Sequence, residues 1–217
     1  MDSQRVVVED VWKAYRPGLW VLRGISFEVY PGDFVAIVGA NGSGKTTLLK
    51  IITGLLRPSR GKVLVCGHEP WDIRAKRCIG AIMHDNFLYE ELTVSENLRL
   101  YGGLNGVAID SSKSSNIAEK LEVNKYMDAL VMWLSFGWRR RSDIVRALLH
   151  SPKVVVIDEP FTGLDKNASR SLLSLIESLV EEGSSVIVTT PKGEEEVISR
   201  ANRVAVIKEG LLEWVKK

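Results

Sequence analysis

Short runs of β-branched and apolar residues recur along the chain and alternate with segments of helical periodicity. The runs at 34–38 and 154–157 are apolar at every position, which is typical of central strands covered on both faces. Between residues 168 and 180, apolar side chains recur at three- and four-residue steps, which predicts an amphipathic helix. Further strands are expected at 6–11, 63–65, 186–189 and 204–207, with a last strand or short apolar edge at 211–215. This alternation predicts an α/β fold whose sheet is largely parallel at its centre, with helices on both faces.

The middle of the chain has a different pattern. From residue 94 to about 149 the β-branched runs disappear, and helical stretches are broken by a polar loop at 105–116 that contains four serines. Such a loop is expected to be exposed and mobile. We therefore expect one domain over 1–217, with a core at about 1–93 and 150–217 and a helical subdomain at about 94–149.

Composition narrows the class of protein. The 217 residues carry 29 Lys and Arg against 27 Asp and Glu, a net charge of +2, and 45% are hydrophobic. These proportions exclude a disordered chain and argue against nucleic acid as a default partner. No apolar run approaches the roughly 18 residues needed to span a bilayer, and the first residues lack an export-signal pattern. With Cys66 and Cys78 at no metal-binding spacing, we expect a cytoplasmic protein with buried thiols in a reducing compartment.

A phosphate-binding loop follows the run at 34–38. The segment reads Gly39-Ala-Asn41-Gly42-Ser43-Gly44-Lys45-Thr46-Thr47 and satisfies the P-loop pattern. Small residues let successive backbone N–H groups surround a phosphate, and the helix expected at 46–53 directs its positive end at the same anion. In this pattern Lys45 reaches the β- and γ-phosphates of a nucleotide, and the Thr46 hydroxyl binds Mg²⁺.

A second candidate feature, an acidic pair, follows the run at 154–157. Asp158-Glu159-Pro160 follows it directly, at the carboxyl end of a central strand, where α/β sheets bind ligands. Asp158 is a candidate Mg²⁺ ligand, and Glu159 is a candidate general base for an attacking water. These two features permit a kinase, a GTPase or an ATPase. The chain lacks the arginine-rich lid usual in nucleoside monophosphate kinases and the Asn-Lys-x-Asp segment of GTPases.

The segment Leu134-Ser135-Phe136-Gly137-Trp138 decides between these classes. It lies just before a helix expected at 139–150, and Gly137 precedes Asp158 by 21 positions. Together with the P-loop and the acidic pair, it resembles the Leu-Ser-Gly-Gly-Gln signature of the ATP-binding-cassette (ABC) ATPases, and the resemblance covers nearly all of the chain. Arg141 and Arg146 match the basic positions usual in the helix that follows that signature.

The resemblance implies a RecA-like P-loop NTPase core with N-terminal antiparallel β strands and an inserted helical subdomain. It implies ATP and Mg²⁺ as cofactors, and a homo- or heterodimer of ATPase subunits. In each site Lys45, Thr46 and Asp158 come from one chain, and Ser135 and Gly137 from the other. Tyr15 falls where the family places an aromatic residue that stacks on adenine, and 161–165 resembles the D-loop. The stretch at 88–98 resembles the family's docking region for an integral membrane transporter subunit, which implies a peripheral position on the inner face of the cell membrane.

Three departures from the family pattern bear on mechanism. His84 occupies the position of the Q-loop glutamine, where an imidazole suits Mg²⁺ poorly; it is instead a candidate to contact the attacking water or the membrane partner, with a packing role equally open. Phe136 and Trp138 replace Gly and Gln in the signature. Pro191 stands where the family carries its switch histidine, and Thr190 or Lys192 are the available substitutes. We expect ATP binding to be retained and hydrolysis to be slow. The alternative is a non-catalytic or regulatory nucleotide-binding subunit.

Other candidate residues have plainer interpretations. The run Arg139-Arg140-Arg141 is expected to be a solvated, partly structural helix start rather than a nucleic-acid contact. His68 and His150 are expected to be surface or packing residues, because neither has a partner at a metal-binding spacing. The transported substrate and the direction of transport are not readable from these residues.

Overall fold

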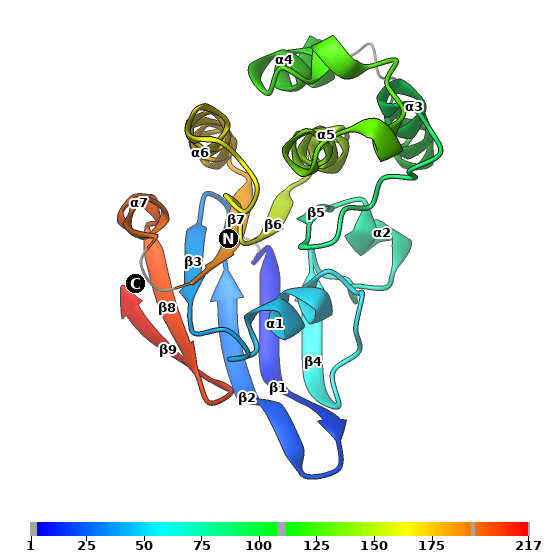
Figure 1. The fold of residues 1–217 in the computed structure, drawn as a ribbon. Helices are drawn as coiled ribbons and strands as arrows, with labels where there is room; N and C mark the ends of the chain where they lie inside the picture. Colours follow the sequence, from blue (N-terminus) through cyan, green and yellow to red (C-terminus); the bar gives the residue numbers. More distant parts are fainter. Residues whose placement is uncertain (1–3, 108–111, 192–193, 217) are drawn as a thin grey trace.

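The computed structural model describes residues 4–107, 112–191 and 194–216. Within these ranges the strands form two sheets (Figure 1). A small antiparallel sheet has the order β2-β1-β4, and a larger sheet has the order β5-β6-β7-β3-β8-β9, in which the pairs from β5 to β8 are parallel and β9 is antiparallel. The strands are β1 (Val6–Arg16), β2 (Leu19–Val29), β3 (Phe34–Val38), β4 (Arg60–Val65), β5 (Ile79–Ile82), β6 (Val154–Asp158), β7 (Ser185–Thr190), β8 (Arg203–Lys208) and β9 (Leu211–Lys216).

The central strands are buried on both faces, as their unbroken apolar runs predict. Along β3, the alternating residues Phe34, Ala36 and Val38 belong to a core cluster shared with α5 (Phe136–Leu148) and α6 (Lys166–Glu181). The intervening Val35 and Ile37 belong to a second cluster shared with α1 (Lys45–Ile52) and the antiparallel sheet. The period-two alternation of a strand thus divides one sequence run between two cores.

The helical lobe consists of α3 (Val94–Asn105), α4 (Ser112–Lys120), η1 (Val123–Tyr126), η2 (Val131–Trp133) and α5, and lies at the top of Figure 1. Short helices α2 (Ile73–Lys76) and α7 (Glu195–Arg200) complete the described elements. Among the described residues, no helix combines the length and the hydropathy that crossing a membrane requires.

The α/β fold class and the strands expected from the sequence are confirmed, and the helix expected at 168–180 is α6. Two expectations in the lobe are wrong. Residues 112–116, expected within a polar loop, begin α4, while 108–111 lie outside the described residues. The helix expected from residue 139 begins at Phe136, with Ser135 as its N-cap, so residues 136–138 of the signature segment already have helical backbone. Cys66 and Cys78, expected to be buried, are half-buried and pack against the second core cluster.

A buried asparagine holds the entrance of the lobe together. The Asn97 side chain is 0% exposed. Its Nδ2 donates to the carbonyls of Tyr89 and Thr93 at 3.0 Å, and its Oδ1 accepts from the Tyr89 N–H at 2.8 Å. The amide therefore ties the start of α3 to the segment before it, which is the stretch that resembles a membrane-subunit docking region.

Replacing Asn97 with alanine is expected to lower the free energy of unfolding by about 1–3 kcal/mol, because the Tyr89 N–H loses its acceptor and the carbonyls of Tyr89 and Thr93 each lose one donor. Denaturant unfolding of the purified chain measures this. Arg99→Ala, at an exposed position of the same helix, is the control and should change stability by less than about 0.5 kcal/mol. Equal stabilities of the two variants would contradict the assigned role.

Candidate nucleotide site

The P-loop connects β3 to α1 and depends on glycine where the chain is tightest. A Cβ at Gly39 would lie 2.6 Å from the Ser43 Oγ and 2.7 Å from the Ile207 carbonyl oxygen. Gly44, the N-cap of α1, has a φ of 107°, which side-chain-bearing residues rarely adopt. The loop therefore curls tightly enough to present its backbone N–H groups toward one point at the start of α1.

Lys45 is the first residue of α1 and is buried. Its Nζ donates to the carbonyl oxygens of Gly39 at 2.8 Å and Ala40 at 3.1 Å. These two bonds hold the ammonium group inside the loop, so a positive charge lies beside the place where the P-loop pattern expects phosphate.

Thr46 and Asp158 meet at the carboxyl end of the sheet. The Thr46 Oγ1 donates to the Asp158 Oδ2 at 2.8 Å, and the Thr189 Oγ1 donates to the Asp158 Oδ1 at 2.5 Å. A hydroxyl and a carboxylate oxygen in contact are hard oxygen donors of the kind Mg²⁺ prefers, so these residues fit that ion. Thr189 was not singled out from the sequence; its position at the end of the strand at 186–189 was the available signal.

Glu159 adopts an uncommon backbone conformation. Its φ is 49°, in the left-handed region that costs a side-chain-bearing residue roughly 1–3 kcal/mol. Its N–H donates to the Thr189 carbonyl oxygen at 3.1 Å, and the Thr162 Oγ1 lies 3.5 Å from its Oε2. The turn places the Glu159 side chain among the residues that line the P-loop pocket.

That pocket has a volume of about 350 Å³ and joins residues far apart in sequence. Tyr15 from β1 is 57% exposed, and its hydroxyl lies 3.2 Å from the Thr47 Oγ1. The pocket is lined by Tyr15, Val21, Asn41, Gly42, Gly44, Lys45, Thr46, Thr47 and Glu159. An exposed ring, a phosphate-binding loop and a carboxylate therefore share one cavity, which is the arrangement that binding and cleaving a nucleotide requires.

Ser135 and Gly137 are not among the residues that line this pocket. They line a separate pocket of about 220 Å³ together with Trp138, Arg141, Gly163 and Asp165. The described structure therefore separates the predicted site residues into two groups within one chain.

The bulky signature residues pack on their own chain. A Cβ at Gly163, in the segment that resembles the D-loop, would lie 2.1 Å from the Phe136 ring, so the ring rests directly on that glycine. The Trp138 ring lies 4.3 Å from the Arg141 guanidinium and 4.4 Å from the Tyr126 ring. Both aromatic side chains thus find partners within the lobe and the D-loop segment.

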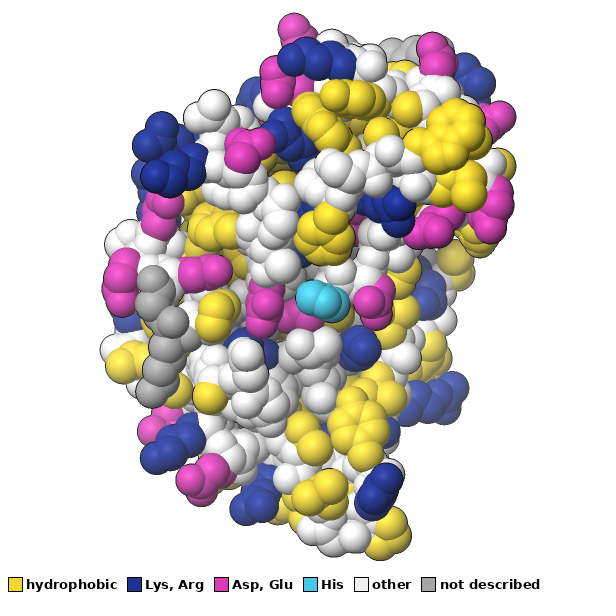
Figure 2. Space-filling view, in the orientation of Figure 1, with side chains coloured by type: hydrophobic (Ala, Val, Ile, Leu, Met, Phe, Trp, Pro, Cys, Tyr) yellow, Lys and Arg dark blue, Asp and Glu magenta, His cyan; other side chains and the backbone are white. Residues whose placement is uncertain are grey.

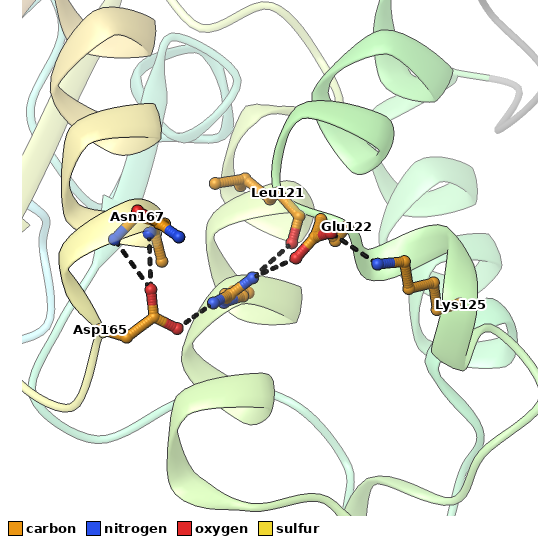
Figure 3. A network of polar contacts seen from close by, with 7 residues as sticks. Leu121, Glu122, Lys125, Asp165 and Asn167 are labelled. Carbon is orange, nitrogen blue, oxygen red and sulfur yellow. Dashed lines mark hydrogen bonds and ion pairs between the residues drawn. The ribbon is translucent and has the colours of Figure 1, made fainter.

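Arg141 links the lobe to the start of α6 through Glu122 and Asp165, which are both labelled in Figure 3. Its guanidinium donates to the Asp165 Oδ2 at 2.5 Å and to the Leu121 carbonyl and the Glu122 Oε2 at 3.3 Å. The other Asp165 oxygen caps α6 through the N–H groups of Asn167 and Ala168. Hydrogen bonds to these backbone N–H groups and to the arginine hold the pKa of Asp165 below its usual value.

The arginine run is expected to be a solvated, partly structural helix start; for Arg140 and Arg141 the structural part is confirmed and the solvated part is wrong. Arg140 and Arg141 are 3% and 7% exposed. Arg140 and Arg141 lie one turn before the buried Ile144 and Val145 on α5, so both side chains fall on the inner side of the helix. The half-buried His150 has a packing role, with its Nε2 3.1 Å from the Ile79 carbonyl oxygen.

The structure also describes the two places where the family carries its Q-loop glutamine and its switch histidine. His84 is exposed and is the second residue after β5. At the end of β7, the Thr190 hydroxyl donates to the Glu194 carboxylate rather than to Glu159. Pro191 offers no side-chain donor, and Lys192 lies outside the described residues. No imidazole stands at this end of β7 within the part of the chain that the structure describes.

Hydrophobic side chains are exposed over the helical lobe and near the β1–β2 hairpin (Figure 2). In the lobe, Trp133 is 76% exposed, and Tyr89, Met132 and Phe136 are also exposed. Tyr89 belongs to the stretch held by Asn97, so the face around that stretch is partly apolar.

The fold and the P-loop pocket define a nucleotide-binding ATPase cassette. The family model for ABC transporters matches residues 22–162, and the chain belongs to this family. It is 36% identical over 215 residues to the Nod factor export ATP-binding protein I of Burkholderia thailandensis, covering 97% of this chain and 70% of that protein. It is also 36% identical over 196 residues to the lipoprotein-releasing system ATP-binding protein LolD 1 of Rhodopirellula baltica, covering 85% and 86%.

Solved structures agree with this assignment. The ATP-binding subunit of an ABC transporter matches with a TM-score of 0.86 at 27% identity, covering 97% of this chain and 90% of that one. A dimeric ATP-binding cassette in a post-hydrolysis state, bound to ADP and Pi, matches with a TM-score of 0.84 at 27% identity, covering 98% and 99%. The chain is thus an ATP-binding subunit of the ABC transporter type, an ATPase by family.

Proposed function

We propose that two copies of this chain, or this chain and a similar one, pair head to tail around two ATP molecules and drive a separate membrane subunit. The observation that carries this proposal is the separation of the two pockets. Ser135 and Gly137 line a pocket apart from the one that holds Lys45, Thr46 and Glu159. A second chain would supply the missing pair to each P-loop pocket, and a similar cassette is dimeric in its post-hydrolysis state.

Within each site the roles follow from chemistry. Lys45 stabilises phosphate charge, Thr46 and Asp158 would hold Mg²⁺, and Glu159 accepts a proton from the attacking water. The exposed Tyr15 ring provides a stacking surface for adenine. Mg²⁺, when bound, neutralises charge on the phosphates. Binding closes the pair and hydrolysis reopens it, so ATP biases an element with two states.

The membrane subunit would dock on the lobe, beside residues 88–93. The exposed Tyr89 and the nearby Trp133 and Met132 offer apolar surface for such a partner. In this arrangement the core comprises about 1–93 and 150–217 and the helical subdomain about 94–149. The chain would be cytoplasmic and peripheral on the inner face of the membrane.

We also propose that hydrolysis is slow compared with the family. Pro191 has no group that bridges Glu159 and the γ-phosphate, and the Thr190 hydroxyl is engaged by Glu194. The same observation favours a second function, a regulatory subunit that binds ATP without useful turnover. The carboxylate of Glu159 in the P-loop pocket favours turnover.

The test is steady-state ATP turnover of the purified chain, alone and after co-purification with its membrane subunit. We expect ATP-dependent dimers, ATP binding, and a low rate that the membrane subunit raises. A rate typical of the family for the isolated chain would contradict slow hydrolysis. ATP binding with no turnover in either preparation would favour the regulatory function, and an ATP-bound monomer would contradict the paired site.

A further inference from the structure

Arg140 is an arginine of α5 that is almost wholly enclosed, at 3% exposure. Its guanidinium donates to the carbonyl oxygens of Asp158 at 2.8 Å and Glu159 at 3.2 Å, and also to that of Met83. Burial lowers the pKa of Arg140, while the carboxylates of Asp143, Asp158 and Glu159 oppose this shift. A guanidinium stays protonated in such surroundings, so a charged, planar group with several donors lies beneath the end of β6.

These contacts fix the backbone on both sides of one residue. Each peptide unit is planar, so the direction of the Cα–Cβ bond, from which a side chain starts, is set by the orientation of the two peptide planes that flank its Cα. The carbonyl of Asp158 belongs to the plane before Glu159, and the carbonyl of Glu159 to the plane after it. One guanidinium holds both, and the bond from the Glu159 N–H to Thr189 adds a second restraint on the first plane.

The held conformation is one that Glu159 would not keep unaided. Its φ of 49° lies in the left-handed region, which is unfavourable for a residue with a side chain and persists only when its surroundings over-determine it. Without the guanidinium, the plane after Glu159 keeps the bond from the Thr162 N–H at 3.3 Å, which lies within the same turn, but it loses the bond that anchors it to α5. The turn can then relax toward a commoner conformation. The carboxylate would then move away from its place in the P-loop pocket.

We propose that Arg140 is a positioning residue that holds the Glu159 carboxylate in the geometry required for hydrolysis. The inference rests on the proposed function, in which Glu159 accepts the proton from water. A buried charge is costly, and well-packed apolar side chains often replace it without loss of stability. In this proposal the buried charge serves catalysis, because the guanidinium binds backbone carbonyls on both sides of the Glu159 Cα.

The experiment compares single-turnover hydrolysis with ATP binding in Arg140→Gln and Arg140→Lys. A displaced general base affects the chemical step, so the hydrolysis rate constant of Arg140→Gln should fall by about tenfold to a hundredfold. Its ATP dissociation constant should stay within about twofold, because Lys45 and the P-loop are unchanged. Arg140→Lys keeps the charge but cannot span the same carbonyls, so it should restore less than half of the lost rate.

Arg146→Gln is the matched control. Arg146 also lies on α5, and its guanidinium donates to the Asp143 carboxylate and to a carbonyl of β5, that of Ala81, both at 2.6 Å, rather than to Asp158 or Glu159. Assays run well below the unfolding temperature of each variant, and Arg146→Gln should hydrolyse ATP at a rate within about twofold of the parent chain.

Several outcomes would overturn the proposal. The first two are an unchanged hydrolysis rate constant in Arg140→Gln and a parental rate constant in Arg140→Lys. The other two are a loss of ATP affinity in Arg140→Gln as large as its loss of rate, and a loss of rate in Arg146→Gln equal to that in Arg140→Gln. If Arg140→Gln does not fold, Arg140→Lys alone decides, since a parental rate would show that charge suffices. Glu159→Gln separates this inference from the proposed function: retained turnover there contradicts the general base itself, whereas its loss beside an active Arg140→Gln contradicts only the positioning role.

Discussion

Replacing Glu159 with glutamine is expected to reduce ATP turnover by at least about a hundredfold, within the range that general bases contribute. Glutamine has nearly the shape of glutamate but accepts no proton at neutral pH. ATP should still bind, because the P-loop and Tyr15 remain, and its persistence should hold the two chains together. Size-exclusion chromatography with light scattering in ATP and Mg²⁺ should therefore show a stable dimer, with ATP rather than ADP recovered from it.

Glu181→Gln is the control for this prediction, because it removes an exposed carboxylate at the end of α6. It should behave like the parent chain in both assays. Turnover of Glu159→Gln at the parental rate would refute the general-base role. A loss of turnover without a trapped dimer would contradict the head-to-tail pair but not the base.

Replacing Pro191 with histidine is expected to raise turnover by about tenfold or more, approaching the contribution of a positioned acid–base group. The strand order explains why this position matters. β7 lies between β6, which ends at Asp158 and leads to Glu159, and β3, which leads into the P-loop. Residue 191 directly follows β7, so an imidazole there would stand between the carboxylate and the phosphate site.

Pro191→Ala is the matched control, because it restores a backbone N–H and chain flexibility without an imidazole. Its turnover should remain near that of the parent chain. The imidazole of Pro191→His should also introduce an inflection in the pH–rate profile near the ordinary histidine pKa of about 6.5. A parental rate in Pro191→His, or an equal gain in Pro191→Ala, would show that the missing imidazole does not limit hydrolysis.

The parts predicted from sequence were those set by local pattern. Unbroken apolar runs identified β3 and β6 as central strands, because both faces of each are covered. The P-loop and the acidic pair were found because their chemistry requires fixed residue types at fixed spacing. The proximity of Lys45, Thr46 and Asp158 then followed from parallel strands that end at the same edge of the sheet.

The errors came from contacts that no local pattern encodes. Arg140 was interpreted as solvated because three consecutive arginines suggest an exposed face, and its carbonyl partners lie 18, 19 and 57 residues away. The early start of α5 was missed because Phe136 and Gly137 have modest helix propensity. The backbone there is instead set by packing, with the Phe136 ring resting on Gly163.

That contact has an evolutionary consequence. The ring occupies the space that any side chain at position 163 would fill, so Phe136 adds to the restriction that a φ of 78° already places on that position. A lineage that acquired the phenylalanine could not afterwards gain even a methyl group at 163 without moving the ring. Among descendants of such an ancestor, the two positions should change together, so that a residue larger than glycine at 163 accompanies a small residue at 136.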